Sequence, residues 1–125
     1  MLKYLDRTLA VLLALGAGVG HTLGSLAAYA HEPTTLLWSL NTSVLGVLLG
    51  TLHLLRSFRS ADRALALLLV LPTLAWLISA LYFGALIHAP ADPRVVFFVV
   101  LCVGLIAFSV RGALGEGRRS LPTPG

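Results

Sequence analysis

Four long apolar runs constrain what this chain can fold into. No Asp, Glu, Lys or Arg interrupts residues 8–30, 33–55, 64–91 or 95–110. A helix needs about 20 apolar residues to cross the hydrocarbon core of a bilayer, and the first three runs reach that length. The fourth run is shorter, but Arg94 and Arg111 at its edges can extend their side chains to the headgroups. Each run therefore predicts one membrane-spanning helix.

Composition excludes an ordinary soluble domain and favours helices over strands. Only 11% of the 125 residues are charged, against about 25% in soluble domains. The runs are continuous rather than alternating, and they are dominated by Leu and Ala. We therefore expect an all-α integral membrane four-helix bundle over residues 1–113 and a flexible cytoplasmic tail over residues 114–125. The expected helices cover about residues 5–30, 34–56, 61–88 and 92–111.

The placement of the basic residues predicts the orientation of the bundle. Arg94 is the only basic residue on the side of the bundle that holds the two turns near residues 31–34 and 88–93. The other eight basic residues, on the opposite side, are Lys3, Arg7, Arg56, Arg59, Arg63, Arg111, Arg118 and Arg119. Basic residues concentrate on the cytoplasmic side of membrane proteins, so we expect both termini to be cytoplasmic. Because topology already accounts for these charges, they do not indicate nucleic-acid binding.

The N-terminal run has an alternative interpretation as a signal peptide. The tripeptide Ala28-Tyr29-Ala30 resembles a cleavage site, and cleavage would leave His31 as a new N-terminus. The apolar run is longer than the hydrophobic region of a signal peptide, which favours a membrane helix. Cys102 is the only cysteine, so an intramolecular disulfide and CxxC redox chemistry are excluded.

The two expected outer turns share a short pattern. Both fit A-x-x-H-x-P, at Ala28, His31 and Pro33 and again at Ala85, His88 and Pro90. Each match ends a helix that runs outward. The pattern raises the alternative that the bundle consists of two repeated helical hairpins.

Small residues form two stripes that predict close helix packing. Gly16, Gly20, Gly24 and Ala28 recur every four residues and share one face of the first helix. Thr42, Gly46 and Gly50 repeat this spacing on the second helix. Small residues let membrane helices approach closely, so the two stripes can face each other as a glycine zipper. In the alternative, one stripe packs the hairpin and the other mediates oligomerisation.

A layer of polar side chains is expected near the middle of the bilayer. Counting from the outer turns places His21 at about the depth of residues 41–44, Ser79 and Cys102. The candidate ligand-binding residues of this layer are His21, Thr22, Asn41, Ser79 and Cys102. Polar groups in hydrocarbon face the bundle interior and need partners. The layer could hold a ligand headgroup or relay a proton, or His21 could simply bond Asn41 or Ser79 and set the helix register.

The remaining histidines lie near the ends of the expected helices. His31 and Glu32 at one outer exit, with His88 and Asp92 at the other, are candidate ligands for a divalent metal or a haem. Histidine is also common at headgroup level without binding anything. His53 is expected to be an interfacial residue.

Several kinds of chemistry find no support in the sequence. No acidic residue falls within the expected apolar spans, which weighs against carboxylate-based proton or cation antiport. The chain has no nucleotide-binding glycine loop, HExxH motif or nucleophile elbow. A non-enzymatic role is therefore favoured, and no cofactor is indicated.

The segment around His21 resembles a known kind of protein. Gly20, His21, Thr22 and Gly24 match a GHTxG signature in the first helix of small bacterial four-helix membrane proteins. The resemblance covers one helix by motif and the whole chain by architecture. It implies a location in the bacterial cytoplasmic (inner) membrane and supplies no function.

Three functions are compatible with these features. The first is a packing or assembly subunit that self-associates or joins other membrane subunits, since most features concern packing and topology. The second is a bundle that binds a quinone, haem or lipid at the polar layer around His21. The third is a small transporter or channel.

Overall fold

The computed structural model describes residues 1–115 and consists of four long helical spans. Its elements are α1 (Leu2–Leu15), η1 (Gly16–His21), α2 (Thr22–Tyr29), α3 (Pro33–Phe58), α4 (Arg63–Leu86) and α5 (Pro93–Gly115). The first three join into one span, and all four spans are long and apolar enough to cross a membrane. The predicted all-helical fold with four apolar helices is confirmed, and residues 1–115 contain no strand. The last helix continues past residue 111, and the rest of the expected tail lies outside the described residues.

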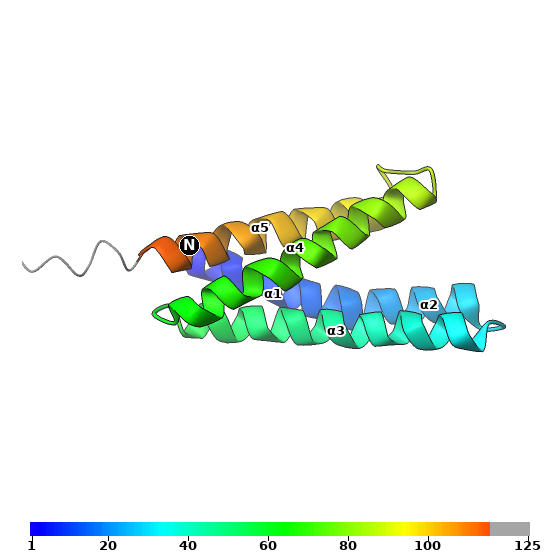
Figure 1. The fold of residues 1–125 in the computed structure, drawn as a ribbon, viewed down its shortest axis with the longest axis horizontal. Coiled ribbons are helices and arrows are strands. Elements are labelled where there is room, and N and C mark those ends of the chain that lie inside the picture. Colours follow the sequence, from blue (N-terminus) through cyan, green and yellow to red (C-terminus); the bar gives the residue numbers. More distant parts are fainter. Residues whose placement is uncertain (116–125) are drawn as a thin grey trace, which may run out of the picture.

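The helices form two hairpins that separate toward one end of the molecule (Figure 1). The N-terminus, the turn between α3 and α4 and the end of α5 lie together, and we call this the terminal end. The other two turns lie at the opposite, distal end. The span from α1 to α2 packs along α3, while α1 also contacts α5. Toward the distal end, the hairpin of α4 and α5 diverges from α2 and α3.

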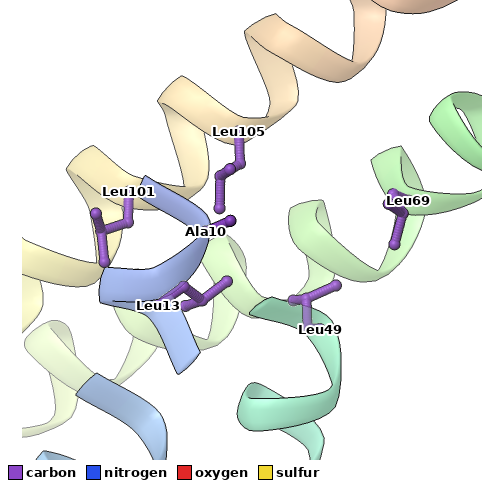
Figure 2. Close-up of a cluster of buried hydrophobic side chains, with 6 residues drawn as sticks. All are labelled: Ala10, Leu13, Leu49, Leu69, Leu101 and Leu105. Atoms are coloured by element: carbon purple, nitrogen blue, oxygen red, sulfur yellow. The ribbon is translucent and has the colours of Figure 1, made fainter. Parts of the chain in front are cut away.

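The apolar core joins all four spans (Figure 2). Its buried members are Ala10, Leu13, Leu49, Leu69, Leu101 and Leu105. Many large apolar side chains point outward instead; Leu71, for example, is 74% exposed. Such an apolar exterior suits a protein surrounded by lipid tails, and the four long apolar helices indicate a multi-pass membrane protein.

Two glycines bring α3 into close contact with the first span. A Cβ atom on Gly50 would lie 2.6 Å from the backbone nitrogen of Ala14 and 2.8 Å from the carbonyl oxygen of Ala10. Gly46 likewise lies against Ala17 and the indole of Trp76. The backbones of α1 and α3 therefore meet where glycine removes the side chain.

The expected zipper between the two small-residue stripes is wrong. The glycines of α3 contact the alanines of the first span, not the stripe of Gly16, Gly20, Gly24 and Ala28. Within the described chain, a Cβ atom on Gly20 or Gly24 would have nothing within 4 Å. Equal spacing showed that each stripe shares a face, but it did not show which face points toward which neighbour.

The first span was predicted to be one helix over about residues 5–30, but it is not a continuous α-helix. Residues Gly16–His21 form a π-helix, which is wider than an α-helix. Gly16, Gly18 and Gly20 all fall in this segment, and glycine has low α-helix propensity and a permissive backbone. The wider turn places His21 at the junction between η1 and α2.

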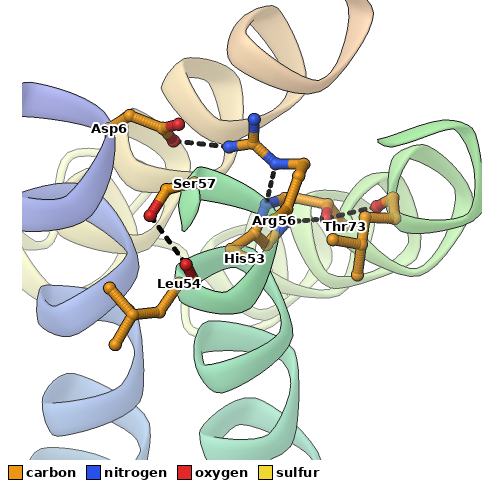
Figure 3. Close-up of polar contacts among 7 residues, drawn as sticks. Asp6, His53, Leu54, Arg56, Ser57 and Thr73 are labelled. Carbon is orange, nitrogen blue, oxygen red and sulfur yellow. Dashed lines mark hydrogen bonds and ion pairs between the residues drawn. The ribbon is translucent and has the colours of Figure 1, made fainter. Parts of the chain in front are cut away.

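A buried polar chain connects three spans near the terminal end (Figure 3). The guanidinium of Arg56 in α3 forms an ion pair with Asp6 in α1, and its Nε donates to Nδ1 of His53 at 3.4 Å. The Nε2 atom of His53 lies 2.7 Å from Oγ1 of Thr73 in α4. Thr73 in turn donates to the carbonyl oxygen of Leu69 at 2.6 Å.

Two of these residues are more buried than the sequence indicated. His53, expected at the membrane interface, is fully enclosed by the protein. Asp6 lies inside α1 and is buried, although no acidic residue was expected within a span. Arg56 lies 50 positions away in the sequence, and it supplies the counter-charge that makes burial of the Asp6 carboxylate tolerable.

His88 ends α4 in a left-handed conformation. Its φ is 53°, the only positive φ of a non-glycine residue in the described chain. The His88 N–H donates to the carbonyl of Ala85, and the Ala89 N–H donates to the carbonyl of Gly84. These two bonds form a Schellman motif, which usually places glycine at the left-handed position. His31 has no such conformation, so the shared A-x-x-H-x-P pattern does not produce two equivalent turns.

Asp92 immediately precedes α5 and is paired with Arg94. Its Oδ1 atom accepts from the backbone N–H and from Nε of Arg94, both at 2.9 Å. Its Oδ2 atom accepts from a terminal guanidinium nitrogen of the same residue at 2.8 Å. The side-chain and backbone hydrogen bonds from Arg94 lower the pKa of the Asp92 carboxyl to about 2.

Candidate ligand-binding cleft

A cleft of about 1070 Å³ lies between the two hairpins, where they diverge. One side is formed by η1, α2 and α3, and the other by α4 and α5. Binding sites for small molecules typically enclose about 300–1,000 Å³ and are mostly apolar with a few polar groups. The cleft therefore has the size and character of a ligand site.

The small-residue stripe of the first span forms one wall of the cleft. Gly16, Gly20, Gly24 and Ala28 all line it. Because Gly20 and Gly24 have no neighbour within 4 Å of an added Cβ, their backbone borders open space. This stripe was expected to pack against α3. It instead leaves this wall of the cleft without large side chains.

Aromatic side chains from α4 and α5 contribute to the opposite wall. Trp76 and Phe98 pack edge to face with centroids 6.0 Å apart, and Phe97 and Phe98 do so at 5.2 Å. All three line the cleft. Gly16 fits beneath Phe97, since an added Cβ there would lie 2.5 Å from the Phe97 ring. The glycine and aromatic walls therefore meet at Gly16.

His21 belongs to a serine cluster on the wall formed by the first span and α3. Its Nδ1 atom lies 2.9 Å from Oγ of Ser43 and 3.4 Å from Oγ of Ser25. The Ser25 hydroxyl donates to the carbonyl oxygen of His21 at 2.7 Å and lies 2.6 Å from Oγ of Ser39. His21, Ser25 and Ser39 line the cleft, and Ser43 is buried behind them. This cluster is the main polar feature of the wall.

The structure brings only part of the predicted polar layer together. His21 and Ser79 line the cleft, as does Thr42, which was expected only as a packing residue. Thr22 and Asn41 do not line it. Asn41 is instead exposed on the exterior of α3.

The other predictions for this layer also change. Cys102 is fully buried away from the cleft. The hydroxyl of Ser79 donates to the carbonyl oxygen of Ala75 in its own helix, at 2.9 Å. His21 therefore bonds Ser43 in the structure, rather than Asn41 or Ser79. Residue counting grouped these residues by their position along the helices, but that position does not determine the direction of a side chain.

Sequence reasoning missed the serines that actually surround His21. A signal was present, because Ser25 follows His21 by four residues and Ser39 precedes Ser43 by four. Residues four apart share a helix face. The hairpin turn between α2 and α3 then brings the two pairs to the same level.

The candidate metal ligands do not assemble. His31 and Glu32 lie at the turn after α2, and His88 and Asp92 lie at the separate turn after α4. Glu32 accepts a hydrogen bond from Thr35 at 3.0 Å. Among residues 1–115, no group of three His, Cys, Asp or Glu side chains could hold a metal ion. These four residues have the local roles of helix ends.

Comparison with known proteins adds no further constraint on the cleft. No family model matches the chain, and neither a curated protein nor a solved structure shows significant similarity to it. The resemblance of the segment around His21 to small bacterial membrane proteins stays a prediction. The site must therefore be interpreted from its own geometry.

Proposed function

We propose that this protein binds a lipid-like molecule inside the membrane, in the cleft beside His21. The observation that carries the proposal is the coincidence of an apolar cleft of about 1070 Å³ with the His21 serine cluster on its wall. The apolar walls suit a hydrocarbon chain, and the cluster supplies a polar contact for a headgroup. A water-soluble ligand would gain little from such walls.

A variant that fills the cleft tests this proposal. Gly24→Leu adds a side chain whose Cβ atom would have nothing within 4 Å, so we expect it to extend into the cleft without displacing its neighbours. Ala27→Leu is the matched control, because Ala27 is exposed on the same helix and does not line the cleft. Native mass spectrometry of the protein released from membranes should show a bound apolar molecule in the wild type and the control. The Gly24→Leu variant should lose it.

Two results would contradict ligand binding. One is a wild-type protein that carries no molecule above the level of bulk lipid. The other is equal retention by the wild type and Gly24→Leu, which would place the bound molecule elsewhere on the surface.

A role as an assembly subunit is the second candidate. It is favoured by Gly20 and Gly24, whose backbone is not covered by any described part of the chain. A helix from a second copy or from another membrane subunit could approach there closely. Sizing in a gentle detergent tests this role: a complex that Gly24→Leu dissociates and Ala27→Leu leaves intact would support it, and a monomeric wild type would contradict it.

We further propose that both termini face the cytoplasm of a bacterial cell. The support is the charge asymmetry, because six of the seven basic residues within residues 1–115 belong to the parts of the chain that form the terminal end. Cysteines introduced at Ser60 and Ala91, in turns at opposite ends, would report the orientation when treated with an impermeant thiol reagent. Cys102 is fully buried and should give little background. Labelling from outside the cell at position 60 and not at 91 would reverse the assignment.

A further inference from the structure

The hydrogen bonds around His21 indicate which ring nitrogen carries its proton. Ser43 is buried, and within residues 1–115 its hydroxyl bonds only Nδ1 of His21. If Nδ1 carried the proton, the Ser43 hydroxyl would have no acceptor for its own. A buried donor without an acceptor is costly. The arrangement that satisfies both groups has Ser43 donating to Nδ1, which leaves the proton of the neutral imidazole on Nε2.

The neighbouring hydroxyls have already used their protons. Ser25 donates to the carbonyl oxygen of His21, so Ser39 donates to Ser25. Thr42 donates to the carbonyl oxygen of Trp38 at 3.1 Å, and Ser79 donates within its own helix. These serine and threonine hydroxyls therefore have no proton left for a ligand.

Two of the donors that remain on the cleft walls are N–H groups. Within residues 1–115, neither Nε2 of His21 nor the indole N–H of Trp76 forms a hydrogen bond, and both side chains line the cleft. They come from opposite walls, His21 from the first span and Trp76 from α4. Arg94, paired with Asp92, and the Tyr29 hydroxyl also line the cleft, but they lie next to the distal turns, at the start of α5 and the end of α2. The inner cleft therefore offers unused donors in apolar surroundings.

From this we infer that the ligand of the cleft carries a carbonyl oxygen on an apolar chain, and that this oxygen accepts a hydrogen bond from Nε2–H of His21. The inference rests on the proposed function. A carbonyl is the matching chemistry, because it accepts without donating and costs less to bring into hydrocarbon than a charged group. The hydrocarbon chain of the ligand would lie along the wall formed by the small residues, at Gly20 and Gly24. Two sources present such a carbonyl in a membrane: the ring of an isoprenoid quinone and the acyl ester of a lipid.

Three ligands of matched chain length separate these sources and test the hydrogen bond. Decylubiquinone presents quinone carbonyls, methyl undecanoate presents an ester carbonyl, and decylbenzene presents no carbonyl. Each would be titrated into nanodiscs containing the protein, with empty nanodiscs as the reference for partitioning. We expect at least one carbonyl ligand to bind about fivefold or more tightly than decylbenzene, the gain of roughly one hydrogen bond. The tighter of the two carbonyl ligands identifies the source.

Variants of His21 assign the effect to its Nε2–H group. His21→Leu should abolish the advantage of the carbonyl ligand while decylbenzene binds as before. His21→Gln places an amide N–H at a comparable distance from the backbone and should retain part of the advantage. Ser43→Ala keeps the imidazole but removes the donor to Nδ1, so the advantage should fall without loss of the ring. This last variant serves even if substitution of His21 impairs folding.

Nitrogen NMR of histidine-labelled protein provides an independent readout of the proton. The His21 signals, identified by their absence in His21→Gln, should show a protonated Nε2 and an unprotonated Nδ1. Predominant protonation of Nδ1, or equal affinities for all three ligands in the wild type and His21→Leu, would overturn the inference. Equal affinities would leave the proposed function standing. Absence of binding by every ligand, decylbenzene included, would overturn both.

Discussion

The Nε2 atom of His53 lies 2.7 Å from the Oγ1 atom of Thr73, and both side chains are fully buried. This hydrogen bond joins α3 to α4 at the end where the two hairpins converge. Because Arg56 donates to Nδ1 of His53, the proton of the ring is on Nε2 and is donated to Thr73. The bond ties the two hairpins together beside the cleft, which is lined by the sequence neighbours Leu52 and Pro72.

Loss of the Thr73 hydroxyl should destabilise the bundle. Thr73→Val keeps the shape of the side chain but leaves Nε2–H of His53 without an acceptor, so we expect a loss of about 1–2 kcal/mol. SDS unfolding titrations in mixed micelles would measure it. Thr51→Val is the matched control, because Thr51 is exposed and its hydroxyl bonds only the carbonyl of Val47 in its own helix. Equal effects of the two substitutions would mean that the link to His53 contributes nothing to stability.

The ion pair between Asp6 and Arg56 should be costly to break on one side only. Asp6→Asn leaves the buried Arg56 without its counter-charge, and we expect a loss of about 3 kcal/mol or more. The double variant Asp6→Leu with Arg56→Met removes both charges and should be clearly more stable than the single variant. A double variant that is no more stable than Asp6→Asn would show that the pair itself, rather than the unpaired charge, determines the effect.

Glycines that look alike in the sequence should respond in opposite ways to alanine. Gly50→Ala places a methyl group within 2.6–2.8 Å of the α1 backbone, so we expect a loss of about 1–3 kcal/mol. Gly24→Ala meets nothing within 4 Å and should leave stability unchanged or raise it slightly through helix propensity. Both variants can be measured in the same unfolding assay. A reversed order would contradict the packing of α1 on α3.

His88→Gly should stabilise the protein. Glycine adopts a φ of 53° without the steric cost that histidine incurs, so we expect a gain of about 1 kcal/mol. His31→Gly is the comparison at the other distal turn, where no positive φ would be relieved, and it should bring no such gain. If metal ions stabilised the wild type and failed to stabilise His88→Gly, the turn would have a ligand role rather than a conformational one.

The number of helices and their apolar character could be predicted because they depend on local composition. A long run without charges favours a membrane-spanning helix whatever its tertiary contacts are. The clusters of charged residues mark where each run ends. The contact between Asp6 and Arg56 could not be predicted in the same way, since it depends on how α1 lies against α3. The π-helix at Gly16–His21 could not be predicted either, because glycine content permits such a segment without specifying it.

The candidate site was predicted in part for the same reason. His21 and Ser79 were placed at a common depth from residue counting, and both line the cleft. Counting could not show that Asn41 faces outward or that Cys102 is enclosed elsewhere. Nor could it show that the hairpins diverge, which is what turns a small-residue stripe into a cleft wall.

The central claim is that the cleft between the hairpins is the place where a lipid-like molecule binds. Photo-crosslinking with a diazirine-bearing fatty acid methyl ester in membranes, followed by peptide mass spectrometry, tests it most directly. We expect saturable labelling of cleft residues such as Trp76 and Ser79, and loss of that labelling in Gly24→Leu but not in Ala27→Leu. Labelling that is unsaturable and spread over outward-facing residues such as Leu71 and Val44, unchanged in Gly24→Leu, would contradict the account.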